Sequence, residues 1–149
     1  MTVNKWLVRL ATFGPVGYFI LPGTTATMIS LPILCWVRAY IQHYWLQALF
    51  IIIMVGIANR AILHALRHLR RFDDPPEIVI DEFVGVFVAF WNIPLSASSL
   101  LIGFILFRFF DILKIGGVSY FERFTDGWGI ILDDVMAGLI CNLTLHLLF

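Results

Sequence analysis

The chain has 149 residues and a mass of 17.0 kDa; 60% of the residues are apolar, only 13% are charged, and the mean hydropathy is +0.91. Soluble domains are about 45–50% apolar and about 25% charged, so this composition excludes an ordinary soluble domain and indicates a membrane protein. The 10 basic and 10 acidic residues cancel, which removes any net-charge argument for nucleic-acid binding. The charges are nevertheless segregated, because every acid lies between Asp73 and Asp134.

Apolar segments separated by charged residues, Pro or Gly predict an all-α polytopic membrane protein. About four to five helices, each near the ~20 residues that cross ~30 Å of hydrocarbon, would form one compact bundle and a single domain over residues 1–149. The first, about Thr24–Val37, is short and rich in small residues, which leaves a partial or re-entrant span open. The others are expected at about Tyr44–Leu63 with an extension to Arg71, Glu77–Ile93, Leu95–Leu113 and Trp128–Phe149.

The N-terminal region and the two cysteines carry weak signals. Lys5 and Arg9 precede an apolar stretch, but Gly14, Pro15 and Gly17 interrupt it and no small-residue cleavage site follows, so we expect this segment to be retained. The two cysteines lie in apolar runs without metal-like spacing, which predicts buried free thiols at Cys35 and Cys141.

Basic residues predict the orientation, because Lys and Arg accumulate in cytoplasmic loops. With the N-terminus inside and five spans, all basic residues except Arg38 fall on or near the cytoplasmic side. Arg60, Arg67 and Arg71 share one face of the extended second helix, which would attract anionic lipid headgroups at ~1 kcal/mol per basic residue. The alternative for this face is a topological anchor without binding specificity.

Five carboxylates fall at one depth in this arrangement, near the cytoplasmic ends of the third, fourth and fifth helices: Asp81, Glu82, Asp111, Asp133 and Asp134. At ~1.5 Å per residue each lies within roughly 10 Å of the inner interface. An Asp facing lipid near a helix centre costs ~2.5–3.5 kcal/mol, so these side chains are expected to face inward.

Small residues accompany the acids on the same helix faces, since side chains four residues apart share a face. The three stripes are Asp81, Gly85 and Ala89; Asp133, Ala137 and Cys141; and Asp134, Gly138 and Asn142. Small residues let membrane helices approach closely. The carboxylate faces are therefore predicted to be the packed faces, with the acids converging between helices.

Clustered carboxylates in a partly dry space repel one another unless cations join them. Hard oxygen ligands suit Mg²⁺, which prefers a few carboxylates plus substrate phosphate. The alternative is that the acids pair with Arg108, Lys114 and Arg123 to hold the helices together.

A metal and carboxylate cluster at headgroup depth, with Arg108 and Lys114 three residues on either side of Asp111, fits phosphate-ester chemistry on a lipid. The metal would neutralise phosphoryl oxygens and lower the pKa of a bound water. A basic side chain would hold the phosphate and offset charge in the transition state.

Three segments resemble the signature blocks of the phosphatidylglycerophosphatase A family: Asp74–Gly85, Phe107–Lys114 and Gly129–Gly138. The upstream Pro22-Gly23-Thr24 is similar to the conserved N-terminal Pro-Gly-Thr of that family. The blocks occur in the family's order over residues 22–138.

The resemblance implies a Mg²⁺-dependent, all-helical enzyme of the bacterial inner membrane that hydrolyses phosphatidylglycerol phosphate to phosphatidylglycerol and inorganic phosphate. It implies metal-ligand or catalytic acid and base roles for Asp81, Glu82, Asp111, Asp133 and Asp134, and phosphate contacts for Arg108 and Lys114. The family usually follows its Lys with Pro-x-Pro, whereas this chain has Ile115-Gly116-Gly117, which affects the loop after Lys114 more than the chemistry.

The segment Pro22-Gly23-Thr24 also has a physical interpretation. Thr24 or Thr25 is a candidate cap of the first helix, and the N–H groups of Gly23 and Thr24 at a helix start would attract phosphate. The alternative is a plain cap and a tight turn.

Other functions fit the same acids. One alternative is a divalent-cation or proton-coupled transporter, although transporters place their sites near the midplane between repeats, and no repeat is visible here. Another is a noncatalytic helical subunit. For a phosphatase, a metal-bound water and an aspartyl nucleophile both remain open, and composition leaves a homo-oligomer open.

Overall fold

The computed structural model describes residues 4–70, 75–113 and 127–149. These residues form six α-helices and one short 3₁₀ helix, with no strand among them. The helices are α1 (Lys5–Ala11), η1 (Val16–Tyr18), α2 (Pro22–Tyr40), α3 (Tyr44–Leu69), α4 (Ile80–Ala89), α5 (Ala97–Leu113) and α6 (Gly127–Leu148). The all-helical prediction is confirmed.

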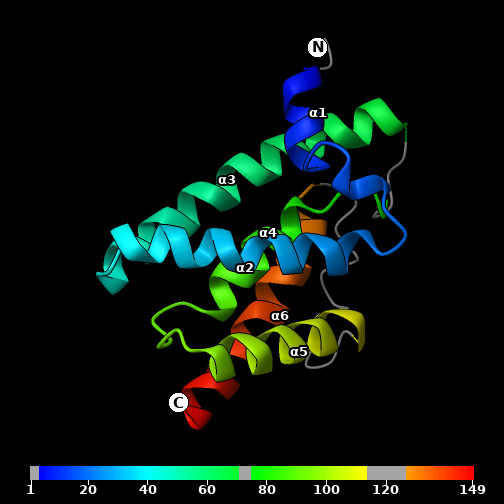
Figure 1. Cartoon of the computed structure of the whole chain (residues 1–149). Helices are drawn as coiled ribbons and strands as arrows, with labels where there is room; N and C mark the ends of the chain where they lie inside the picture. The colour runs from blue at the N-terminus through cyan, green and yellow to red at the C-terminus, as the bar shows by residue number, and fades with distance from the viewer. Residues whose placement is uncertain (1–3, 71–74, 114–126) are drawn as a thin grey trace.

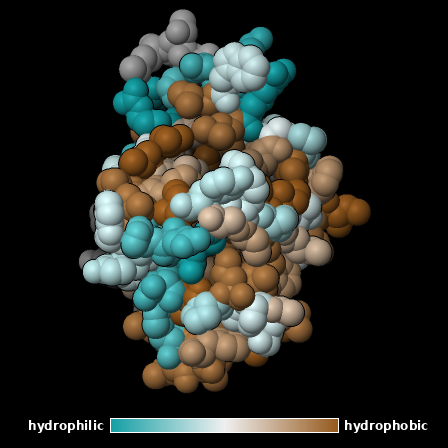
Figure 2. Space-filling model, turned by 60° about the vertical axis from the view of Figure 1, so that its left-hand side comes forward, coloured by the Kyte–Doolittle hydropathy of each residue, from teal (hydrophilic) through white to brown (hydrophobic). Residues whose placement is uncertain are grey.

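Two of the helices are long and apolar enough to cross a membrane. They are α3, with a mean hydropathy of 2.0, and α6, with a mean hydropathy of 1.6. Large apolar side chains are exposed on both, among them Ile52, Ile53 and Leu143, and hydrophobic residues cover much of one face of the molecule (Figure 2). Such a surface suits lipid as the surrounding solvent, and the number of spans stays a prediction.

Helix α4 is the central helix of the bundle. It contacts each of the other five α-helices, and Glu82 is its one residue that is not fully buried. A helix that is apolar on every side is stable only when neighbours cover it all round. Figure 1 shows α2 and α3 crossing the pair formed by α4 and α6, with α5 near the other end of that pair.

Helices α4 and α6 run parallel in a constant register. Asp81 lies beside Asp134, Gly85 beside Gly138, and Ala89 beside Asn142, and each pair is separated by 53 residues in the sequence. A Cβ atom on Gly138 would lie 2.5 Å from the carbonyl oxygen of Gly85. Two of the three predicted stripes, those that begin at Asp81 and Asp134, are therefore the surfaces that meet.

The third predicted helix is too long, because α4 covers only Ile80–Ala89 of the expected residues 77–93. Asn92 has a positive φ of 58° and Pro94 follows it, so the chain turns immediately after the helix. Side chains from elsewhere bind the carbonyls at this end: the Asn142 amide donates to Ala89 and Trp91, and the Arg38 guanidinium donates to Phe90 and Ile93.

The N-terminal region contains a helix that the sequence analysis did not predict. Helix α1 is seven residues long, and the side chain of Asn4 accepts a hydrogen bond from the Trp6 N–H at its start. Its Val8 and Ala11 are buried, and Ala11 belongs to the core shared with α3. A helix of two turns has too few buried positions for the 3.6-residue period to be recognised in the sequence.

We expect Gly138→Ala to lower the free energy of unfolding by about 1–3 kcal/mol, because the added methyl group meets backbone that has to move. Gly56→Ala is the matched control, since nothing lies within 4 Å of a Cβ at that position. The control should unfold at the wild-type temperature or above, as Ala favours helix over Gly. Thermal unfolding in detergent measures both, and an unchanged melting temperature for Gly138→Ala would contradict the close contact.

Candidate active site

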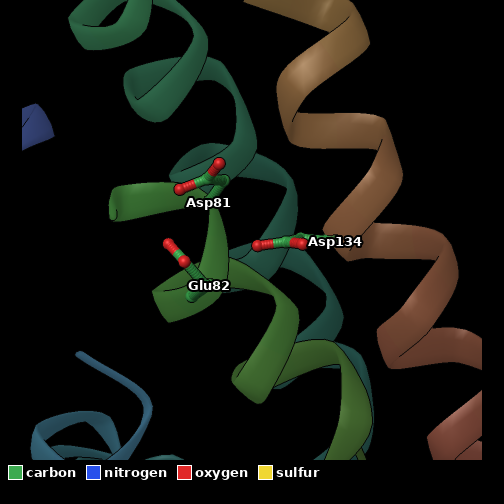
Figure 3. A group of neighbouring side chains, drawn as sticks. All are labelled: Asp81, Glu82 and Asp134. Atoms are coloured by element: carbon green, nitrogen blue, oxygen red, sulfur yellow. The ribbon is translucent and has the colours of Figure 1, made fainter. Parts of the chain in front are cut away.

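Three carboxylates from two helices converge at the start of the α4 and α6 pair. Asp81, Glu82 and Asp134 each offer an oxygen atom, and these atoms lie within 4.8 Å of one another. Figure 3 shows the three side chains directed into one shared space between the helices. Asp81 is 4% exposed and Asp134 is 5% exposed, so bulk water does not screen the group.

The helix register explains why these side chains meet. Asp81 and Asp134 are the first members of the two stripes that face each other, and the contact between Gly85 and Gly138 one turn later brings their backbones together. Glu82 follows Asp81 and points toward the same space from the adjacent face of α4.

The carboxylate group fits a divalent cation. One oxygen of Glu82, Oε2, is buried and has no hydrogen-bond partner among the described residues. Hard oxygen ligands at this separation are those that Mg²⁺ prefers, and its charge would offset their repulsion.

Helix α5 contributes a cation to the same site. Arg108 forms an ion pair through Nη1 with Asp111, one turn later on α5. The Nε of Arg108 is buried and has no hydrogen-bond partner among the residues that the structure describes. The guanidinium therefore has a donor left for a further acceptor, while Asp111 holds its other side.

The start of α2 lies against both charged groups. A Cβ atom on Gly23 would collide with the Glu82 carboxylate and would lie 3.1 Å from Nη1 of Arg108. A side chain at this position would therefore displace the ends of these two charged side chains. The first backbone hydrogen bond of this turn runs from Thr25 N–H to the Leu21 carbonyl at 2.9 Å, so the N–H groups of Gly23 and Thr24 precede the helical ladder.

The predicted cap at Thr24 or Thr25 is wrong. Helix α2 begins at Pro22 with no side-chain cap, and the Thr25 hydroxyl donates to the Leu21 carbonyl within the first turn. Proline suits this first position because its missing N–H would have no partner there.

The remaining predicted residues lie outside the three-carboxylate group or outside the described ranges. Asp111 and Asp133 are not members of the three-carboxylate group. Asp133 is buried on the stripe of α6 that continues to Cys141, whose thiol donates to the Gly103 carbonyl of α5. Arg60 and Arg67 are exposed on α3. Lys114 and Arg71 lie outside the described residues.

Sequence reasoning missed the segment that positions the start of α4. The Val79 N–H donates to the Ala11 carbonyl at 2.9 Å, and Gly17 packs directly on the Glu77 carbonyl, where no Cβ would fit. The signal was present in the closely spaced Gly14, Pro15 and Gly17, which the sequence analysis treated only as an interruption.

Together these features define the class of protein: it is all-helical and membrane-associated, with a buried carboxylate site beside an arginine. The family model for Phosphatidylglycerophosphatase A matches residues 9–149. The chain belongs to the phosphatidylglycerophosphatase A family, which confirms the resemblance seen in its three sequence blocks.

Two relatives illustrate this similarity. A Phosphatidylglycerophosphatase A from Escherichia coli is 29% identical over 140 residues, which cover 92% of this chain and 79% of the relative. One from Haemophilus influenzae is 52% identical over 68 residues, which cover 44% of this chain and 42% of that protein. No solved structure matches the chain.

The geometry predicts different roles for the neighbouring Asp134 and Asp133, because only Asp134 belongs to the three-carboxylate group. We expect Mg²⁺ to raise the melting temperature of the wild type, because a ligand at 100 times its dissociation constant stabilises the fold by about 2.7 kcal/mol. Asp134→Asn should lose most of this shift, whereas Asp133→Asn should keep it even if its starting stability is lower. Thermal unfolding with and without Mg²⁺ measures both, and equal losses would argue against the three-residue group.

Proposed function

We propose that this protein hydrolyses phosphatidylglycerol phosphate to phosphatidylglycerol and inorganic phosphate at the cytoplasmic face of the bacterial inner membrane, with Mg²⁺ as cofactor. Family membership supports the reaction. The observation that carries the proposal is the convergence of Asp81, Glu82 and Asp134 next to Arg108, because it joins an acidic cation site to a phosphate-binding cation.

Asp81, Glu82 and Asp134 would hold the Mg²⁺ ion. Once bound, the ion supplies positive charge for phosphoryl oxygens and acidifies water. Asp81 and Asp134 are buried, and their attraction for a cation is stronger there than in bulk water because the effective dielectric constant is lower. A phosphomonoester dianion would be repelled by the three carboxylates alone, so the cation is a requirement of the reaction.

Arg108 and the start of α2 bind the phosphate in this proposal. Nε of Arg108 is a buried donor without a partner among the described residues, and Asp111 fixes the orientation of the guanidinium. The N–H groups of Gly23 and Thr24 add donors at the positive end of a 19-residue helix. Gly23 has no side chain, so phosphate oxygens are able to approach this backbone closely.

The arrangement of helix ends supports the assignment to one membrane face. The site gathers the start of α2, the start of α4, the last turns of α5 and the first turns of α6. Successive helices that alternate in direction bring these ends to one side, and the positive-inside rule assigns that side to the cytoplasm. The exposed Arg60 and Arg67, with Arg71 further along the chain, attract anionic headgroups to the same side.

We expect purified protein to release phosphate from phosphatidylglycerol phosphate only when Mg²⁺ is present. Asp134→Asn should lower the rate about 100-fold or more, since it removes an interaction that assembles the charged site. Colorimetric phosphate release in mixed micelles measures the rate. Activity that survives both chelator and Asp134→Asn would exclude the mechanism, and cation uptake into proteoliposomes without phosphate release would favour a transporter.

Trapping of a phosphoenzyme distinguishes the two nucleophiles that the carboxylates allow. For direct attack by water, acid quenching during turnover should trap no phosphoprotein. An aspartyl nucleophile should instead give a phosphoprotein that survives acid quenching and that hydroxylamine cleaves. We expect the first result, because the proposed cation site engages all three converging carboxylates.

A further inference from the structure

A pocket with basic side chains in its wall lies at the N-terminal end of the molecule, between α1, the turn that follows it and the last turn of α3. Its volume is about 530 Å³, and the side chains of Lys5, Arg9, Thr12, Tyr18 and His68 line it. The function proposed above does not use any of these residues.

Hydrogen bonds hold the wall of this pocket in shape. Gly14 N–H donates to the Arg9 carbonyl at 2.8 Å, and Gly17 N–H donates to the Thr12 carbonyl at 2.9 Å. The Thr12 side chain is buried, and its hydroxyl donates to the Gly14 carbonyl at 3.0 Å. Gly14 has a φ of 63°, a left-handed conformation that glycine adopts at little cost. These hydrogen bonds therefore fix the shape of the pocket wall.

Among the residues that the structure describes, the pocket carries positive charge without an acidic partner. Lys5 and Arg9 are four residues apart and share one face of α1, and His68 reaches the pocket from α3. No Asp or Glu lines the pocket, and no ion pair joins Lys5 or Arg9 to a described carboxylate. Charged donors of this kind, next to the hydroxyl of Tyr18, suit the oxygen atoms of a phosphate group.

The surroundings favour a phosphate that belongs to a lipid. Trp6 is 76% exposed and Tyr18 is 61% exposed, and the guanidinium of Arg9 lies 5.5 Å from the ring centroid of Trp6. The apolar Ile20, which follows η1, is 98% exposed. Aromatic and basic side chains that border exposed apolar ones are typical of segments at the headgroup level of a bilayer.

The pocket lies at the same end of the molecule as the carboxylate group and is separate from it. The Ala11 carbonyl accepts a hydrogen bond from Val79, two residues before Asp81, and Gly17 contacts Glu77. A ligand bound here would therefore sit at the membrane level from which the carboxylate site draws its substrate.

We propose that Lys5, Arg9 and His68 form a second anion site, which binds the phosphate of an anionic lipid headgroup. Free phosphate has the same chemistry, and the exposed Trp6 and Ile20 in the neighbouring chain segments favour the lipid. The proposal requires no catalytic turnover, so it stands or fails independently of the proposed reaction.

The test is lipid binding to the full-length protein in detergent with chelator present, so that the carboxylates hold no cation and repel anions. Native mass spectrometry would compare short-chain phosphatidylglycerol with phosphatidylcholine of equal chain length. We expect the wild type to prefer phosphatidylglycerol about tenfold, as one charge-assisted contact supplies. Arg9→Gln and Lys5→Gln should each remove most of that preference, and Arg9→Lys should retain much of it.

Arg70→Gln is the matched control, because Arg70 is an exposed cation at the end of α3 that does not line the pocket. It should keep the wild-type preference. An undiminished preference in Arg9→Gln, or an equal loss in Arg70→Gln, would overturn the proposal. Added inorganic phosphate that leaves the lipid bound assigns the pocket to the headgroup, whereas displacement at submillimolar phosphate would overturn the assignment to a lipid in favour of free phosphate.

Discussion

The close parallel packing of α4 on α6 is the contact on which the rest of this structure depends. Gly85 and Gly138 let the two backbones approach until a methyl group would no longer fit between them. One turn earlier, the same register brings Asp81 beside Asp134. Small residues therefore set a distance between charges, because the helices cannot separate at the acids without losing contact at the glycines.

Bringing like charges together in this way opposes folding unless something compensates. Asp81, Glu82 and Asp134 repel one another in a space that is largely closed to water. Arg108 and the positive end of α2 supply part of the compensation. A bound cation would supply the rest, which couples the stability of the bundle to ligand binding.

The two charged regions of the molecule differ in what covers them. The acids lie between helices, whereas Lys5, Arg9 and His68 lie at the surface beside exposed aromatic side chains. This division follows from the cost of each charge in its place, since long basic side chains reach the headgroup level from an apolar surface and carboxylates are too short to do so. Under the two proposals, an anionic lipid would be attracted at the surface, and its phosphate would meet compensated carboxylates within.

The sequence by itself determined the helical class, most helix positions, the faces that carry small residues and the set of candidate acids. These properties depend on local composition and on spacings of three to four residues, which one segment carries alone. Only the tertiary structure decided that Asp134 joins Asp81 and Glu82 while its neighbour Asp133 does not, and that Gly23 touches Glu82 and Arg108. It also decided where α4 ends, because the donors that bind its last carbonyls come from Arg38 and Asn142. Those facts depend on contacts between residues more than 50 positions apart in the chain, to which no local pattern responds.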